Sequence, residues 1–110
     1  MPTLDELIAI DGVRVAFEFN ADGELKDYRT AAEVRREMAV AIARYCATVT
    51  MNFQTLSGSF TTISEMNWVP QKAWLYTSRD WTVIVGNGGY RGLFVETDKA
   101  DFNRLIRLLA

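Results

Sequence analysis

The amino-acid sequence predicts an α+β fold, with a single five-stranded antiparallel sheet, one long helix on one face and the N- and C-terminal helices on the other. Three observations predict it: residues 30–57 have one long helical apolar period, strand-like segments lie on both sides of that stretch, and short amphipathic helices open and close the chain. The predicted order is α-β-β-α-β-β-β-α. At 110 residues the chain is expected to form one domain, residues 1–110.

The N-terminal part predicts a helix and a hairpin. Residues 3–6 have the form of a capping box, so a helix is expected from Leu4 to about Ile10. Residues 13–19 alternate apolar and polar side chains, which is the period of a strand with one buried face. A turn at 20–23 leads to a second strand at 24–29, whose charged residues are typical of a sheet edge.

The long helix is predicted over residues 30–57, with a second capping box at 30–33 and a glycine stop at 57–59. At about 40 Å it would overhang a domain of this size. We expect its large apolar side to pack on the sheet and its small-residue side to meet the same helix of a second copy. The large side carries Val34, Met38, Ile42, Tyr45, Val49, Phe53 and Leu56; the small side carries Ala39, Ala43, Ala47 and Thr50.

The C-terminal half predicts a loop, three strands and a helix. Pro70 makes a helix through 64–71 improbable, so this segment is expected to be an ordered crossover. The strands are predicted at 73–78, 81–85 and 90–96, with an Asn-Gly hairpin at 86–89. We expect Leu93 and Val95 on one face of the sheet, with Leu75, Ile84 and Phe94 on the opposite face. Asp98 with Asp101 should cap a last helix that buries Phe102, Leu105, Ile106 and Leu109.

Composition excludes several classes of function. The net charge of −2 and the isoelectric point near 5.1 argue against a nucleic-acid partner. The basic pair Arg35-Arg36, flanked by Glu33 and Glu37, is interpreted as a solvated helix face. We expect neither a membrane-spanning segment nor a signal peptide, because the sequence has no run of about 18 apolar residues and no N-terminal apolar run after a basic segment. A single cysteine, Cys46, allows no internal disulfide, so a cytoplasmic location is expected; a buried thiol and a cross-link between two copies both remain open.

No familiar catalytic pattern fits this sequence. The chain has no histidine, which excludes Ser-His-Asp and Cys-His arrangements. A dinucleotide motif begun at Gly86 would need glycine where Arg91 stands, and there is no phosphate-binding loop motif. Lys72, Arg79, Asp80 and Arg91 could form a polar site, although scattered solvated charges explain them as well. We therefore expect neither an enzyme nor a bound cofactor or metal.

Two stretches of the sequence resemble the roadblock family of dynein light chains and bacterial gliding regulators, within the profilin/longin-like group. They are LDELIAIDGVRVAFEFNADGEL at the start and WTVIVGNGGYRGLFVETDKADFNRLIRLL at the end. The resemblance implies a dimer in which the long helices pair and the third strands lie edge to edge. Transferred to this chain, it selects Ala39, Ala43, Cys46, Ala47 and Thr50 on the helix, and Trp74, Leu75, Tyr76 and Thr77 on the strand.

Two functions follow as hypotheses. The first is a non-enzymatic interaction module, which pairs with itself or with a roadblock-like paralogue. The resemblance implies that such a dimer regulates a small Ras-like GTPase or serves as a scaffold or accessory subunit of a larger complex. The alternative is a small-molecule sensor with an apolar pocket under the long helix, walled by Trp68, Tyr76 and Trp81. The three tryptophans, Trp68, Trp74 and Trp81, could equally be core residues under the long helix.

Overall fold

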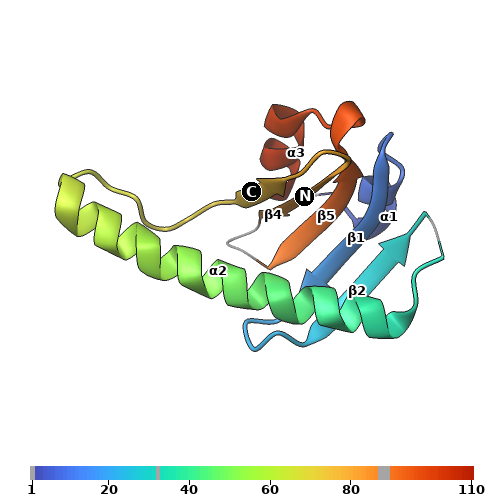
Figure 1. Ribbon diagram of the computed structural model, residues 1–110, viewed down its shortest axis with the longest axis horizontal. Coiled ribbons are helices and arrows are strands. Elements are labelled where there is room, and N and C mark those ends of the chain that lie inside the picture. The colour runs from blue at the N-terminus through green and yellow to red at the C-terminus, as the bar shows by residue number, and fades with distance from the viewer. Residues whose placement is uncertain (1, 32, 87–89) are drawn as a thin grey trace.

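The computed structural model describes residues 2–31, 33–86 and 90–110. It contains one antiparallel sheet with the strand order β2-β1-β5-β4-β3, which confirms the predicted five-stranded fold and its order of elements (Figure 1). The elements are α1 (Leu4–Ile8), β1 (Val13–Phe19), β2 (Leu25–Thr30), α2 (Arg36–Ser64), β3 (Trp74–Thr77), β4 (Trp81–Gly86), β5 (Arg91–Glu96), the 3-10 turn η1 (Thr97–Lys99) and α3 (Phe102–Leu109).

The two short helices α1 and α3 cover one face of the sheet, as predicted. Their first turns are capped by side chains: the hydroxyl of Thr3 accepts the backbone N–H of Glu6 at 3.1 Å, and the carboxylate of Asp101 accepts that of Arg104 at 3.1 Å. Asp98 does not cap α3, because it lies in the preceding 3-10 turn. The core on this face consists of Leu4, Leu7, Val13, Ala16, Ile84, Leu93, Val95, Leu105 and Leu109.

Strand register decides which residues reach this core. Leu93 lies opposite Ile84 and Phe94 lies opposite Val83, so Ile84 shares a face with Leu93 rather than with Phe94. The predicted grouping of Ile84 with Phe94 is therefore wrong. The hairpin expected between β4 and β5 includes residues 87–89, which lie outside the described residues.

The long helix α2 covers the other face and is unbroken over 29 residues, but its ends differ from the prediction. It does not begin at Thr30, because that residue pairs with Val15 as the last residue of β2. It also passes through Gly58 and ends only at Ser64, where Glu65 adopts a left-handed conformation with φ of +59°. The predicted capping box at 30–33 and glycine stop at 57–59 are therefore wrong.

The orientation of α2 is the reverse of the predicted one. Ala39, Ala43, Cys46, Ala47 and Thr50 are between 0% and 7% exposed within the single chain, facing the sheet. Strand β1 presents aromatic rings on this face, and small helix residues are needed for the helix backbone to come close to them. Most of the large apolar side chains that were expected to be buried there lie along the flank of the helix instead, although Ile42 is half-buried against this core and Val34 lies before the helix begins. The core on this face consists of Val15, Phe17, Phe19, Ala43, Cys46, Ala47 and Val85.

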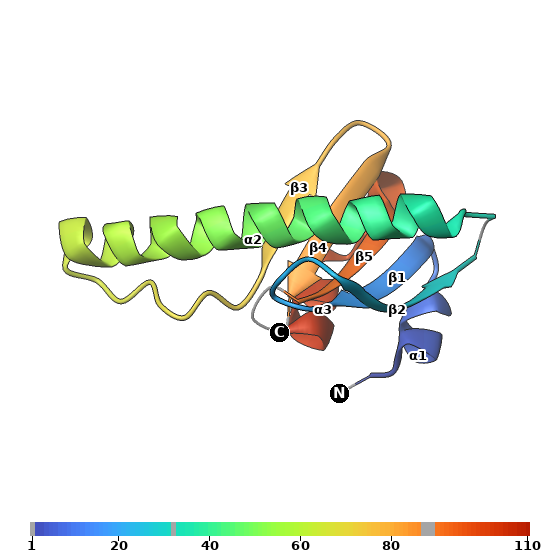
Figure 2. The same ribbon diagram turned by 90° about the horizontal axis from the view of Figure 1, so that it is seen from below.

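The helix crosses the sheet obliquely, and its C-terminal half extends past β3 beyond the sheet (Figure 2). Residues 65–73 then run back beside that overhanging half to reach β3, as both views show (Figures 1 and 2). The molecule is consequently elongated, with extents of 45 × 28 × 28 Å. Within the described part of the chain, no helix is both long enough and apolar enough to cross a membrane.

A candidate interaction surface beside the long helix

The sheet face under α2 is only half covered. The helix packs mainly over β1 and β2 and reaches Val85 and Trp74 on the outer strands, but it leaves other large side chains of those strands exposed. Trp81 on β4 is 46% exposed and Tyr76 on β3 is 67% exposed. Large aromatic side chains on a sheet face normally pack against a second layer, so this face lacks part of its covering layer.

Three hollows follow one another along the flank of α2 that faces β3, and together we call them the α2 groove. The first, of about 580 Å³, lies between Met38 and Trp81. The second, of about 300 Å³, lies between Val49 and Tyr76, and the third, of about 540 Å³, lies between Leu56 and residues 67–74. Ile42 lines both the first and the second, and Phe53 lines both the second and the third. The groove therefore runs along nearly the whole helix.

The helix wall of this groove is apolar and exposed. Met38 is 54% exposed, Tyr45 75% and Leu56 41%, and these residues recur on one flank with the spacing of a helical stripe. Residues 45–64 contain no charged side chain, although 24% of the whole chain is charged. A continuous exposed apolar surface of this kind is typical of a protein interface.

The outer part of the groove is formed by a substructure that we call the arm, residues 51–73. Trp68 holds its two segments together at the tip. The backbone N–H of Trp68 donates to Thr61 Oγ1 at 3.0 Å, its indole Nε1 donates to Ser64 Oγ at 3.1 Å, and its ring lies 5.2 Å from that of Phe60. The ordered crossover predicted for 64–71 is thus confirmed, and it is bound to the helix that precedes it.

The base of the arm is fixed at Thr50. Trp74 Nε1 donates to Thr50 Oγ1 at 2.8 Å, and Gln71 Nε2 donates to the Thr50 carbonyl at 2.9 Å. The ring of Phe53 lies 5.8 Å from that of Trp74. Thr50 is therefore a buried polar anchor inside the chain, whereas the sequence placed it at a contact with a second copy.

The open edge of the sheet is β3, which pairs only with β4 among the described residues. Its four residues, Trp74, Leu75, Tyr76 and Thr77, are the ones that the resemblance selected for a strand-to-strand contact, and the backbone of this edge is free to pair. The five selected helix residues are buried instead. Cys46 nevertheless reaches the second hollow, where it lies near Trp74, Leu75 and Tyr76.

The three aromatic residues expected to wall one sensor pocket are not brought together. Trp81 lines the first hollow, Tyr76 the second and Trp68 the third. The polar set is dispersed as well. Arg91 is buried, where its Nε lies 3.4 Å from Glu18 Oε1 and its Nη2 donates to the carbonyl of Pro2, whereas the other three residues of that set lie near β3 and β4.

Burial also determines the state of the single thiol. Desolvation raises the pKa of Cys46 to about 12, because a thiolate is disfavoured away from water. The thiol therefore stays protonated and unreactive at neutral pH, which supports the interpretation of a buried cysteine over that of a cross-link. No cluster of three or more potential metal ligands occurs in the described ranges.

Comparisons with known proteins agree with this architecture. A family model described as "Uncharacterized conserved protein (DUF2173)" matches residues 3–110. No curated protein sequence matches the chain. Among solved structures, the gliding protein MglB from Thermus thermophilus superposes with a TM-score of 0.72 at 14% identity, covering 96% of this chain and 75% of that one.

Two further structures extend the similarity. A Roadblock/LC7 domain from Streptomyces avermitilis gives a TM-score of 0.72 at 11% identity, covering 96% of this chain and 83% of the other. MglB from Myxococcus xanthus gives 0.63 at 13% identity, with coverages of 93% and 77%. At such identities the similarity shows the fold, and it confirms the fold that the sequence resemblance implied.

Proposed function

This chain belongs to the DUF2173 family and has the roadblock fold, and from that premise we propose that it is a non-enzymatic interaction module that works as a dimer. The observation that carries the proposal is the α2 groove, an exposed apolar surface that passes beside the open edge strand β3. A surface of this composition lowers its free energy by contact with another apolar surface. We propose that a second copy supplies that surface.

The shape of the chain suits a two-fold arrangement. Antiparallel pairing of β3 with β3 of a second copy would extend the sheet across both chains. Because α2 extends past β3, its overhanging half would then lie over the half-covered sheet face of the other copy. The axis would pass near the second hollow, so that the third hollow of each copy faces the first hollow of the other. The large apolar side chains exposed at the third hollow of one copy would then fill the open space at the first hollow of the other copy.

This proposal transfers the interface from the small residues of α2 to the large ones. Val49, Phe53 and Leu56 replace Ala43, Ala47 and Thr50 as helix contacts, while the four residues of β3 keep their proposed role. Apolar and aromatic side chains are the type that dominates homodimer interfaces. The small residues allow the helix to pack closely on the sheet of its own chain.

The resemblance to roadblock proteins suggests the partner class of the assembled dimer. We propose that it regulates a small Ras-like GTPase or acts as a scaffold subunit in a larger complex. An affinity purification from the source cell separates the two, because a GTPase should be recovered in one case and stable complex subunits in the other. Repeating the purification with added GDP or a GTP analogue sharpens the result, since a GTPase partner should bind in one nucleotide state.

Multi-angle light scattering at tens of micromolar tests the dimer itself. We expect twice the chain mass for the native protein and a monomer for Tyr76→Asp, because a carboxylate would be placed in the second hollow beside the axis. Thr48→Asp is the matched control, since Thr48 is exposed on α2 outside the groove. Circular dichroism should show both variants folded. A native protein that remains monomeric at these concentrations would contradict the proposal.

A further inference from the structure

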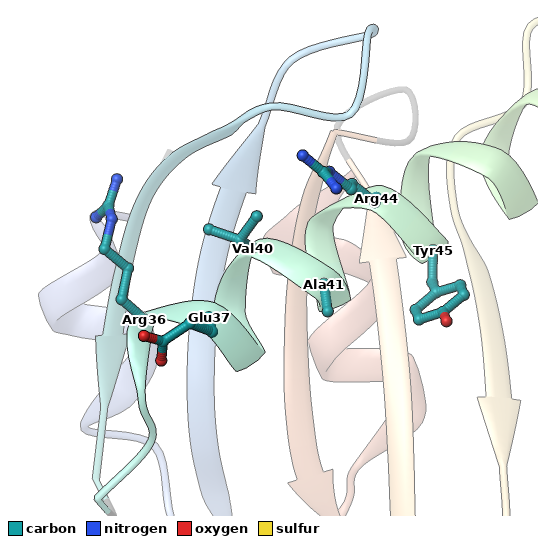
Figure 3. A pocket seen from close by; sticks show the side chains of 6 residues that line it. All are labelled: Arg36, Glu37, Val40, Ala41, Arg44 and Tyr45. Carbon is teal, nitrogen blue, oxygen red and sulfur yellow. The ribbon is translucent and has the colours of Figure 1, made fainter.

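The N-terminal half of α2 has a third face, which neither packs on the sheet nor lines the groove. A hollow of about 620 Å³ lies on this face. Figure 3 shows the side chains that line it. Its six lining residues are Arg36, Glu37, Val40, Ala41, Arg44 and Tyr45. Tyr45 stands at the border, because it also lines the second hollow of the groove.

The six residues form two rows. Arg36, Val40 and Arg44 are spaced by four positions, and so are Glu37, Ala41 and Tyr45. In Figure 3 the two guanidinium groups lie on the same side of the helix as Val40, and the Tyr45 ring lies on the other side. Rows spaced by four residues are the ridges between which a second helix packs. The short side chains of Val40 and Ala41 leave room for a ridge to enter.

The charge of this face differs in sign from that of the protein. Arg35, Arg36 and Arg44 outnumber Glu37 on α2 and its N-cap, which gives this element a net charge of +2. Since the whole chain carries −2, the remainder carries −4. Arg35 is the N-cap, and Arg36 and Arg44 lie in the first third of the helix. The positive charge is therefore local and lies around this hollow.

The two guanidinium groups have no acidic ion-pair partner within the part of the chain that the structure describes. Among the described residues, Arg14, Arg29 and Arg91 each form an ion pair, whereas Arg36 and Arg44 form none. Arg36 is also the first residue of α2, where the helix dipole makes a positive charge unfavourable. Stability of the isolated helix therefore does not explain it.

The stem of Arg44 is held in place by the turn between β1 and β2. A Cβ atom at Gly23 would lie 3.5 Å from the Cα of Arg44 and 3.8 Å from its Cγ, so the turn lies directly against this residue. The guanidinium is thus carried on a stem that is supported on one side. Eight residues separate it from Arg36, which corresponds to about 12 Å along the helix axis.

From these observations we propose that this face binds an acidic α-helix of the partner protein, with carboxylates two turns apart paired to Arg36 and Arg44 and a small side chain seated over Val40 and Ala41. Carboxylates at positions i and i+7 of a helix lie about 10 Å apart on one side, close to the separation of the two arginines. The inference rests on the proposed role as an interaction module and names the chemistry of its partner. It uses a face of α2 that the dimer leaves free.

The probe is a fluorescent, alanine-based helical peptide with Glu at positions i and i+7, compared with the same peptide carrying Lys. We expect the Glu peptide to bind and to shift the methyl NMR signals of Val40 and Ala41. Raising the salt from 50 to 200 mM should weaken binding, because screening reduces the attraction between exposed charges. The Lys peptide should leave these signals unchanged. Binding of both peptides with equal affinity, or no shift of the two signals at millimolar Glu peptide, would overturn the inference.

The double variant Arg36→Glu/Arg44→Glu tests the two arginines, with Arg79→Glu/Arg104→Glu as the matched control of equal charge change. Affinity for the Glu peptide should fall at least tenfold in the first variant and less than twofold in the second. Equal losses of affinity in both variants would mean that binding depends only on the net charge of the protein, and they would refute the site.

Light scattering on the same samples separates this inference from the proposed dimer. A native monomer that still binds the Glu peptide at Val40 and Ala41 would support the acidic site and refute the dimer. A native dimer that does not bind the peptide would refute the acidic site alone.

Discussion

The two faces of the sheet differ in how completely the chain covers them. On the face of α1 and α3, every one of the nine core residues is at most 5% exposed. On the face of α2, the helix lies over β1 and β2, while Trp81 and Tyr76 on the outer strands stay exposed. One face is completed by the chain itself, and the other is left for contact with a second molecule.

The difference arises from how the helices are placed rather than from how apolar they are. The helices α1 and α3 are short, and their apolar residues pack against the core, with Leu105 and Leu109 buried and Phe102 and Ile106 partly buried. The helix α2 has 29 residues and runs obliquely, so roughly half of it has sheet beneath it. Its apolar flank consequently continues past the last strand. Four substitutions would test whether the two faces behave differently.

The largest loss of stability is expected on the closed face. Leu93→Ala should lower the free energy of unfolding by about 2–5 kcal/mol, because Leu93 is fully buried and a cavity would remain. Urea unfolding should give this loss at every protein concentration. A loss below about 1 kcal/mol would mean that this face is less tightly packed than its burial indicates.

Phe53→Ala should act on the open face through assembly. Phe53 is 37% exposed and lines two hollows of the groove, so its truncation should raise the dimer dissociation constant roughly tenfold, or about 1.4 kcal/mol. Analytical ultracentrifugation measures this constant, with Gln54→Ala as the control on the same helix. An unchanged dissociation constant would remove Phe53 from the interface and weaken the contrast between the two faces.

Thr50→Val tests the junction between the body of the protein and the arm. The change removes the acceptor of the Trp74 indole N–H, and the expected cost is about 1–2 kcal/mol of unfolding free energy. Thr50→Ser keeps the hydroxyl and should retain more of the stability. If both variants are equally stable, packing rather than this hydrogen bond holds the base of the arm.

The smallest effect is expected within the arm. Gly58→Ala should stabilise α2 by about 0.5–1 kcal/mol, because Gly58 is an interior helix residue and an added Cβ would meet no atom within 4 Å. Amide hydrogen exchange of residues 51–64 should slow. Gly23→Ala should have the opposite sign, because Gly23 has φ of +90°. A destabilising Gly58→Ala would indicate that the arm needs the missing side chain for contact with another chain.

Features set by nearby residues could be predicted from the sequence. The cap at Thr3 and the cap at Asp101 each depend on side chains within three or four positions, and the structure has both. The predicted alternation in β1 holds for Val15, Phe17 and Phe19, but Val13 and Ala16 are buried in the other core, so the strand has two buried faces rather than one. The fold followed from combining such elements with the apolar faces they create. The resemblance to roadblock proteins, which the solved structures confirm as a similarity of fold, implied the same order.

Features that depend on contacts between segments far apart in the sequence could not be predicted in this way. Residues 30–33 match a capping box, yet the backbone of Thr30 pairs with β1, and sheet hydrogen bonds prevail over a local helix start. Gly58 resembles a helix stop, but an exposed glycine costs only about 1 kcal/mol and Trp68 binds the helix turn that follows it.

The candidate surface shows the same limit most clearly. Periodicity identified both sides of α2 but gave no information on which one faces the sheet. Phe17 and Phe19, which project from β1 toward the helix, decide that question, because bulky rings require small partners. A comparison of the bulk of the aromatic rings on the predicted strand with the bulk of the side chains on each side of the helix would have predicted the observed orientation.

The two edges of the sheet bear on how far assembly can proceed. The edge at β2 is polar and internally tied: Arg29 pairs with Asp27 at 2.7 Å and with Asp5 at 2.9 Å, and Lys26 lies 4.0 Å from Glu18. Charged edge strands resist the addition of a further strand. If two chains join through β3, each end of the resulting ten-stranded ribbon is a β2 edge. Growth would then stop at two chains, and the protein would avoid polymerising into filaments.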